Sequence, residues 1–126
     1  MKQLRIVLIV AFLPLVLWAQ DKEIIVASIR KELRKPEGAL LPGDYAQIRK
    51  LDLSRKGLRD ITYISRLKNL RLLYLHDNMI TDTKPLRSLG RLEVLTLNGN
   101  EDLEEKELSE LRESLKGCTI IGASTN

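Results

Sequence analysis

Three stretches of the chain repeat the same order of apolar and polar positions. The runs IRKLDLSRKGL, LRLLYLHDNMI and LEVLTLNGNED begin at Ile48, Leu70 and Leu92, so each begins 22 residues after the one before. The segments between them, ITYISRLKNL and TKPLRSLGRL, align with each other without a gap. A period this regular predicts one structural unit for each 22 residues.

Each unit is expected to contain a short strand. In LRLLYLHDN, Leu73 and Leu75 alternate with other residues, so both point to one face of a strand. One such strand cannot bury its apolar face alone, so successive strands are expected to stack in parallel around a shared interior. The order L-x-x-L-x-L-x-x-N-x-L at a period of about 20–29 residues is the signature of leucine-rich repeats. The pattern therefore predicts an α/β fold with a short parallel β-sheet.

An asparagine follows the strand in two of the three units. Asn78 and Asn100 occupy this position, whereas the first unit has Lys56 there. A side-chain amide can satisfy backbone groups that a turn leaves unpaired. Stacked asparagines are therefore predicted to form a ladder along the coils, which is incomplete in the first one.

A helix is predicted before the repeats, over the stretch DKEIIVASIRKELRK. Ile25, Ile29 and Leu33 lie on one helical stripe, and Asp21 is the expected N-cap. The sequence PEG that follows is expected to end this helix. A second short turn or helix is expected over residues 44–47, before the first strand.

A helix followed by a strand is predicted after the repeats, in EEKELSELRESLKGCTIIG. The inward positions of this helix are Leu108, Leu111 and Leu115. Cys118 lies 23 residues after Leu95, so it is expected to take the same inward position as a buried, unreactive thiol, and Ile120 to take the next one. The N-terminal helix and this helix-strand unit would cover the two open ends of the stacked coils.

The first residues describe a secretory signal peptide. MKQLR is basic, IVLIVAFLPLVLW has thirteen uncharged residues, and Ala19 precedes a polar stretch. The apolar run is shorter than the roughly 20 residues that span a bilayer. We expect cleavage after Ala19, with an uncleaved anchor as the alternative. This predicts a secreted, periplasmic or cell-envelope location and no membrane span after cleavage.

The chain is thus expected to have five segments. These are a signal peptide (1–19), an N-terminal helical cap (20–47), leucine-rich repeats (48–103), a terminal repeat with a C-terminal cap (104–122) and a tail (123–126).

The run LKNLRLLYLHDNMITDTKPLRSLGRLEVLTLNGN resembles the 22-residue leucine-rich repeats of secreted bacterial proteins of the internalin-like type. Those repeats carry an N-I-x-D-I-x-P-L stretch, which residues 78–86 match except at Thr83. The chain also departs from the pattern at Lys56 and at Asp102, with Leu103 one place late. The resemblance implies a right-handed, curved solenoid and a protein-binding role, without identifying the ligand.

The residues between the inward leucines are expected to form three columns on the concave face of the sheet. These columns are Lys50, Leu72 and Val94; Asp52, Tyr74 and Thr96; and Ser54, His76 and Asn98. Tyrosine buries a large area at little entropic cost, and outward-facing apolar residues beside it suggest a contact surface. We predict that these residues bind a protein ligand. The alternative is an ordinary solvated face on which these side chains pack against each other.

Catalysis and metal binding are not predicted. Ser54, His76 and Asp52 are residue types of an acyl-transfer site, but a flat sheet face offers no pocket and no oxyanion hole. His76 is the only histidine and Cys118 the only cysteine, so we expect no catalytic residues, no metal site, no cofactor and no internal disulfide.

Charge is distributed unevenly along the chain. The formal net charge of +4 becomes +2 without residues 1–19, because Lys2 and Arg5 leave with them, so it gives no argument for nucleic acid. Basic residues predominate over 49–91 and acidic residues over 92–116. This asymmetry would favour an acidic partner or weak head-to-tail self-association, unless both regions are simply solvated.

Two functions from different classes follow. The first is an exported, non-catalytic interaction module that binds a protein through its concave face. The second is a structural component of the cell envelope that self-associates or docks through its ends.

Overall fold

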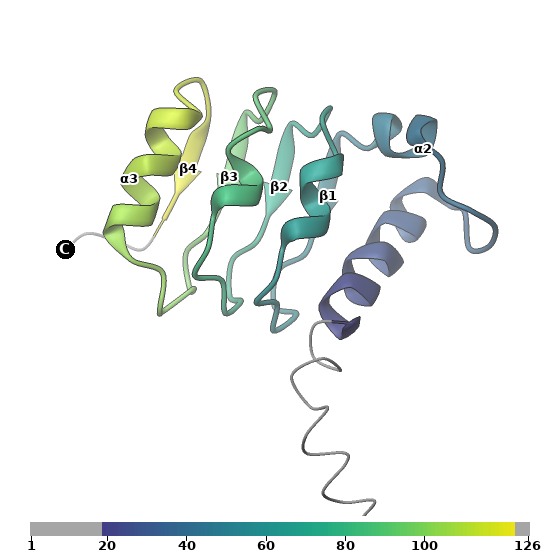
Figure 1. Cartoon of the computed structure of the whole chain (residues 1–126), viewed down its shortest axis with the longest axis horizontal. Coiled ribbons are helices and arrows are strands. Elements are labelled where there is room, and N and C mark those ends of the chain that lie inside the picture. The colour runs from purple at the N-terminus through teal and green to yellow at the C-terminus, as the bar shows by residue number, and fades with distance from the viewer. Residues whose placement is uncertain (1–18, 123–126) are drawn as a thin grey trace, which may run out of the picture.

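The computed structural model of the protein describes residues 19–122. Four short parallel strands form one sheet in sequence order (Figure 1). They are β1 (Lys50–Asp52), β2 (Leu72–Tyr74), β3 (Val94–Thr96) and β4 (Thr119–Ile121). Leu51, Leu73 and Leu95 are register partners in the first three strands, and all three are buried. The inward leucines therefore lie on adjacent rungs of one interior, as the period of the sequence predicts.

A helical segment follows each of the first three strands and lies on the same face of the sheet (Figure 1). These segments are η1 (Thr62–Arg66), η2 (Lys84–Leu86) and α3 (Glu105–Ser114). Each turns fully buried aliphatic side chains toward the strands, namely Ile64, Leu86, Leu108 and Leu111. Burial of one such side chain stabilises the fold by about 1.5–3 kcal/mol. Burial of these aliphatic side chains is therefore the main contribution that holds the coils together.

A further helix, over residues 19–33, lies beside the coil of β1 (Figure 1). Ile25 and Ile29 are completely buried and join the core, as their spacing predicts. The helix ends one turn before the PEG sequence, because Arg34 adopts a left-handed conformation with φ of 53°. The backbone N–H of Lys35 then donates to the carbonyl of Arg30 and closes the helix end. α2 (Pro42–Gln47) follows and leads into β1.

The prediction that Asp21 is the N-cap of this helix is wrong. Residues 19 and 20 are already helical, and Asp21 is a buried helical residue. Its Oδ2 accepts hydrogen bonds from the backbone N–H groups of Arg59 (3.1 Å) and Asp60 (2.9 Å). Asp21 therefore joins the helix to a distant loop, a contact that no local helix-start pattern contains.

The predicted asparagine ladder is present. Asn78 is buried, and its Oδ1 accepts from the backbone N–H groups of Lys56 and Leu58 in the preceding coil. Its amide group donates to carbonyls of its own coil and of the preceding one. Asn100 makes equivalent bonds one coil later. The Lys56 side chain, at the same position in the first coil, is exposed.

The predicted register of the last strand is wrong by two residues. Ile120, rather than Cys118, pairs with Leu95, so the last coil has 25 residues instead of 22. Cys118 is only partly buried, and this burial raises the pKa of its thiol. The last coil contains the ten-residue helix α3 in place of a short 3₁₀ turn. Because an α-helix rises about 1.5 Å per residue against about 2.0 Å for a 3₁₀ helix, this coil needs more residues.

The signal peptide and the C-terminal tail predicted from the sequence fall almost entirely outside residues 19–122. The two residues that flank the expected cleavage bond, Ala19 and Gln20, are helical and exposed. Within the part of the chain that the structure describes, no helix combines the length and apolarity needed to cross a membrane.

Candidate protein-binding face

The strand register places the predicted columns side by side on the face of the sheet that points away from the helical segments. Lys50, Leu72 and Val94 are partners in adjacent strands, and so are Asp52, Tyr74 and Thr96. The third column stays aligned because the backbone N–H groups of Arg55 and Asp77 donate to the carbonyls of His76 and Asn98. The structure therefore brings all nine predicted residues to one side of the sheet, called here the outer sheet face.

Tyr74 lies at the centre of this face and is partly exposed. The Nζ atom of Lys50 lies 5.8 Å from the centre of its ring, a cation–π distance. The ring of His76 lies edge-on to it, with 6.5 Å between the ring centres and 75° between their planes. Leu72 and Val94 are also partly exposed. The face thus presents an aromatic and aliphatic centre whose rings are already held by their neighbours.

Thr96 fixes the orientation of His76. Its Oγ1 lies 2.8 Å from Nδ1 of His76 and also accepts the backbone N–H of Leu75 at 3.2 Å. When the ring is neutral, the threonine hydroxyl can donate to Nδ1, which leaves Nε2–H as the donor that faces outward. Thr96 is only 8% exposed. It therefore supports the face from below, rather than offering the contact surface predicted for it.

Asp52 and Ser54 form a closed pair at the first strand. Oδ1 of Asp52 accepts both the backbone N–H (3.0 Å) and the hydroxyl (2.7 Å) of Ser54. These bonds hold the pKa of Asp52 below its usual value, with smaller contributions from nearby positive charge at His76 and Lys56. The hydroxyl of Ser54 thus donates to the carboxylate of Asp52, whereas His76 pairs with Thr96. The serine and the histidine therefore do not form the hydrogen bond that an acyl-transfer site needs.

The fourth strand extends the face beyond the predicted residues. Thr119 lies beside Val94, and Ile121 lies beside Thr96 with 48% of its surface exposed. Sequence analysis assigned no contact role to the last strand, although its placement of Cys118 and Ile120 inward already leaves Thr119 and Ile121 on the outer side. Because the two registers differ by two residues, the alternation in C-T-I-I signals the outward position of Ile121 in either one, and the length of the last coil decides only which column it joins.

Comparisons of the chain with known protein families and structures agree with its repeat pattern. A family profile described as "Leucine Rich repeats (2 copies)" matches residues 68–113. This part of the chain consists of leucine-rich repeats. Such repeats generally serve as protein-interaction modules.

Curated relatives share the repeats over part of their length. The chain is 40% identical over 78 residues to leucine-rich repeat-containing protein 56 of Rattus norvegicus, and 42% identical over 72 residues to the protein of that name from Homo sapiens. These alignments cover 60% and 56% of this chain but only 14% and 13% of the relatives. The chain therefore corresponds to a small part of these proteins.

Solved bacterial structures share the fold. A leucine-rich-repeat protein of Leptospira interrogans matches 65% of this chain and 22% of its own, with 31% identity and a TM-score of 0.53. Internalin C2 of Listeria monocytogenes matches 82% of this chain and 54% of its own, with a TM-score of 0.60. At 20% identity the second likeness concerns the fold alone.

Among residues 19–122, no group of three histidine, cysteine, aspartate or glutamate side chains is arranged to hold a metal ion.

Proposed function

We propose that the protein is an exported interaction module without catalytic activity, which binds a protein ligand through the outer sheet face. One observation carries this proposal: the register gathers Leu72, Tyr74 and Val94 into a partly exposed centre on the sheet. Buried aromatic residues often dominate the free energy of protein association. The leucine-rich repeats supply the rigid support that such a surface needs.

The contacts around Tyr74 favour binding because they reduce its cost. Lys50 and His76 already restrict the tyrosine ring, and Thr96 already restricts His76. Immobilising a free side chain at an interface costs about 0.5–1.5 kcal/mol, so side chains held before binding lose less. A flat and partly apolar surface with fixed rings suits a folded protein partner better than a small molecule, which needs a concave pocket.

The proposal includes the arrangement of the whole chain. We infer a right-handed solenoid whose ends are closed by the helix over 19–33 and by α3 with β4. The complete burial of Ile25 and Ile29 at one end, and of Leu108 and Leu111 at the other, supports this role. Without such covers, the terminal coils would expose their leucines to water.

The test replaces the centre of the face. Tyr74→Ala combined with His76→Ala should leave the thermal unfolding transition almost unchanged and abolish capture of the ligand that the unaltered chain retains from an envelope extract. Lys106→Ala combined with Ser109→Ala, on the exposed side of α3, is the matched control and should retain the same ligand. Undiminished affinity of the Tyr74 and His76 variant for the purified ligand would refute the site.

Export is part of the same proposal. The basic start, the short apolar run and Ala19 support it. Determination of the first residue of the exported protein tests it, and the expected residue is Gln20.

A structural role in the cell envelope is the second candidate. Ile121 is 48% exposed on β4, the last strand of the sheet among the described residues. An exposed edge strand is a surface on which a second chain can pair. The mass of the protein in solution separates the candidates, because a monomer at low and high salt favours the interaction module over self-association.

A further inference from the structure

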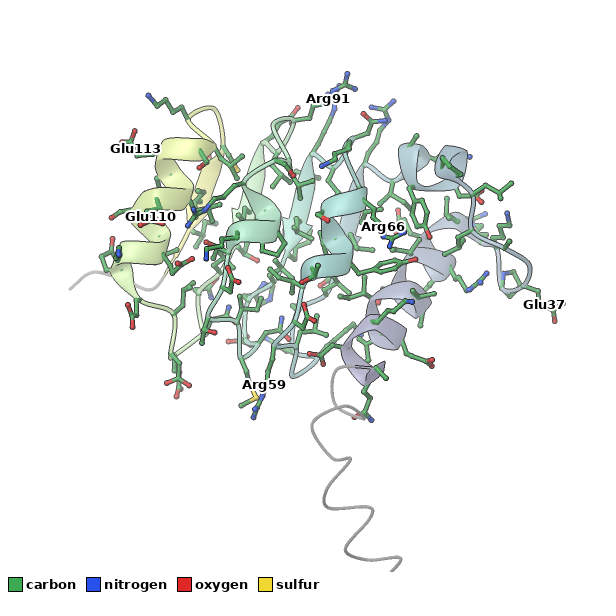
Figure 2. All side chains as sticks on the ribbon, in the orientation of Figure 1. Glu37, Arg59, Arg66, Arg91, Glu110 and Glu113 are labelled. Atoms are coloured by element: carbon green, nitrogen blue, oxygen red, sulfur yellow. The ribbon has the colours of Figure 1, made fainter. Side chains whose placement is uncertain are left out.

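The loops that lead into the amino ends of the strands all lie on one side of the sheet, because the four strands are parallel. This side is called here the amino edge. The loops that enter β1, β2 and β3 carry four exposed cationic side chains, which are Arg49, Lys68, Arg71 and Arg91. In Figure 2, Arg91 lies at this edge among other nitrogen-tipped side chains, whereas Arg59 lies at the opposite edge. The folded chain thus gathers charges that lie up to 42 residues apart in the sequence.

Two of these cations are held by neutral partners. Nζ of Lys68 donates to Oγ of Ser88 at 2.9 Å, and Nη1 of Arg91 donates to Oδ1 of Asn69 at 2.8 Å. Each bond joins one coil to the next. A hydroxyl or amide acceptor fixes the position of a cation without cancelling its charge. Lys68 and Arg91 are therefore positioned in advance and remain able to attract an anion.

The other two cations differ in their surroundings. Arg71 forms an ion pair with Glu93 at 3.2 Å, in which both side chains are at least half exposed. Across residues 19–122, no ion pair involves Arg49, Lys68 or Arg91. The amino edge therefore carries three uncompensated positive charges on neighbouring loops.

The amino edge continues directly into the outer sheet face. Arg49 immediately precedes Lys50, and Arg71 immediately precedes Leu72, the residues that begin the first column. Adjacent strands of a sheet lie about 4.8 Å apart, so one extended segment of a partner can contact several loops at once. A ligand that covers Leu72 and Tyr74 would bring its own border against these cations.

We propose that the amino edge binds an acidic peptide segment of the protein ligand. This inference rests on the proposed function, because it names the chemistry of the same partner. Carboxylates suit the edge, since guanidinium groups bind them through two parallel hydrogen bonds and ammonium groups bind them as point charges. Such a charged border raises the rate of association and selects among partners.

The direct test uses a labelled oligoglutamate peptide as the probe, at low and at high salt. The unaltered chain should bind the peptide at low salt and release it at high salt. The triple variant Arg49→Gln, Lys68→Gln and Arg91→Gln should bind about tenfold or more weakly, because it removes charges that sit on adjacent loops. The matched variant Lys56→Gln, Arg59→Gln and Lys84→Gln removes the same net charge elsewhere and should bind like the unaltered chain.

Two results would overturn the inference. Equal weakening in both triple variants would show that only net charge attracts the peptide. Binding of the sulfated polysaccharide heparin without binding of oligoglutamate would assign the edge to a different class of partner.

The same variants separate this inference from the proposed function. If the Tyr74 and His76 variant loses the captured ligand and the amino-edge variant retains it fully, the inference about the amino edge is wrong and the proposed role of the outer sheet face stands. If the amino-edge variant loses the ligand and the Tyr74 and His76 variant retains it, the outer sheet face is not the binding site, and the ligand binds the amino edge instead.

Discussion

A left-handed backbone conformation recurs at the same point of the first three coils. Arg55, Asp77 and Gly99 are spaced 22 residues apart and have φ values of 57°, 58° and 75°. Only the third is a glycine, the residue type that adopts this conformation at least cost. A Cβ atom built on Gly99 would approach the carboxylate of Asp77 and lie 3.0 Å from its backbone nitrogen. Arg55 and Asp77 show that other residues can adopt this conformation at a cost, so the close approach of Asp77 is what makes glycine necessary in the third coil.

Gly99→Ala should destabilise the protein by about 1–3 kcal/mol, because alanine meets strain at positive φ and crowds the backbone of Asp77. Gly90→Ala is the control, since no atom lies within 4 Å of a Cβ at Gly90. The control should change the free energy of unfolding by less than about 1 kcal/mol. Denaturant titration measures both variants, and an equal response to the two would contradict the argument.

At the scale of elements, a polar pair attaches α3 to the coil of η2. The backbone N–H and the hydroxyl of Thr83 donate to Oε2 of Glu107 at 3.2 and 2.9 Å. Thr83 is completely buried, and Ile61 takes the equivalent position one coil earlier. The threonine that departs from the internalin-like pattern is therefore the residue that meets the carboxylate of the terminal helix. An isoleucine in its place would keep the backbone N–H but lose the hydroxyl, the donor of the shorter of the two bonds.

The contribution of Glu107 to stability should depend on pH. Its hydrogen bonds from Thr83, and then the nearby Arg87 and Lys84, lower the pKa of Glu107 from its usual 4.5. A carboxyl group with a lowered folded-state pKa stabilises the fold above the unfolded-state pKa and loses this effect as the pH falls through the folded-state value. The difference in unfolding free energy between the unaltered chain and Glu107→Gln should thus be largest near neutral pH and shrink below about 4.5.

Denaturant titration at about pH 7 and about pH 3 checks this expectation. Glu113→Gln is the control, because its ion pair with Lys116 spans 3.8 Å between largely exposed side chains. The unfolding free energy of the control variant should differ little from that of the unaltered chain at either pH. A cost for Glu107→Gln that is the same at both pH values would contradict the electrostatic explanation.

At the scale of the whole molecule, both terminal helices are attached to the repeats in the same way, through a side-chain carboxylate. Asp21 accepts from backbone N–H groups of the first coil, and Glu107 accepts from the backbone N–H of Thr83 near the other end. In both cases a carboxylate on a terminal helix accepts backbone N–H groups of the neighbouring coil. Because each coil contacts only its neighbours, the stability of the array depends on how firmly its ends are attached.

Asp21→Ala should destabilise the whole chain, by about 1–3 kcal/mol, because it leaves two partly buried backbone N–H groups without their acceptor. The loss should appear as a lower midpoint of a single thermal transition, since the helix over 19–33 shares one continuous core with the repeats. Glu23→Ala, an exposed position on the same helix, is the control. A separate early transition in Asp21→Ala would show instead that the helix unfolds independently.

The repeating part of this protein can be predicted from its amino-acid pattern alone. The 22-residue period fixed which leucines share the interior, and the asparagines fixed where the strands turn. These features depend on local alternation and on exact repetition, so each copy confirms the others. The outer columns follow from the same alternation, which is why the sequence already places Lys50, Leu72 and Tyr74 on one face.

The points where the repetition stops depend on contacts between residues far apart in the sequence, which come together only in the folded chain. The partners of Asp21 lie 38 and 39 residues away, Glu107 reaches Thr83 across 24 residues, and Ile120 replaces Cys118 in the last register. Asp21 and Glu107 each join a repeat to a terminal helix, and the shift to Ile120 follows from the length of the coil that contains α3. A contact made once, between distant residues, leaves no period to detect, because its free energy comes from two surfaces that meet only after folding.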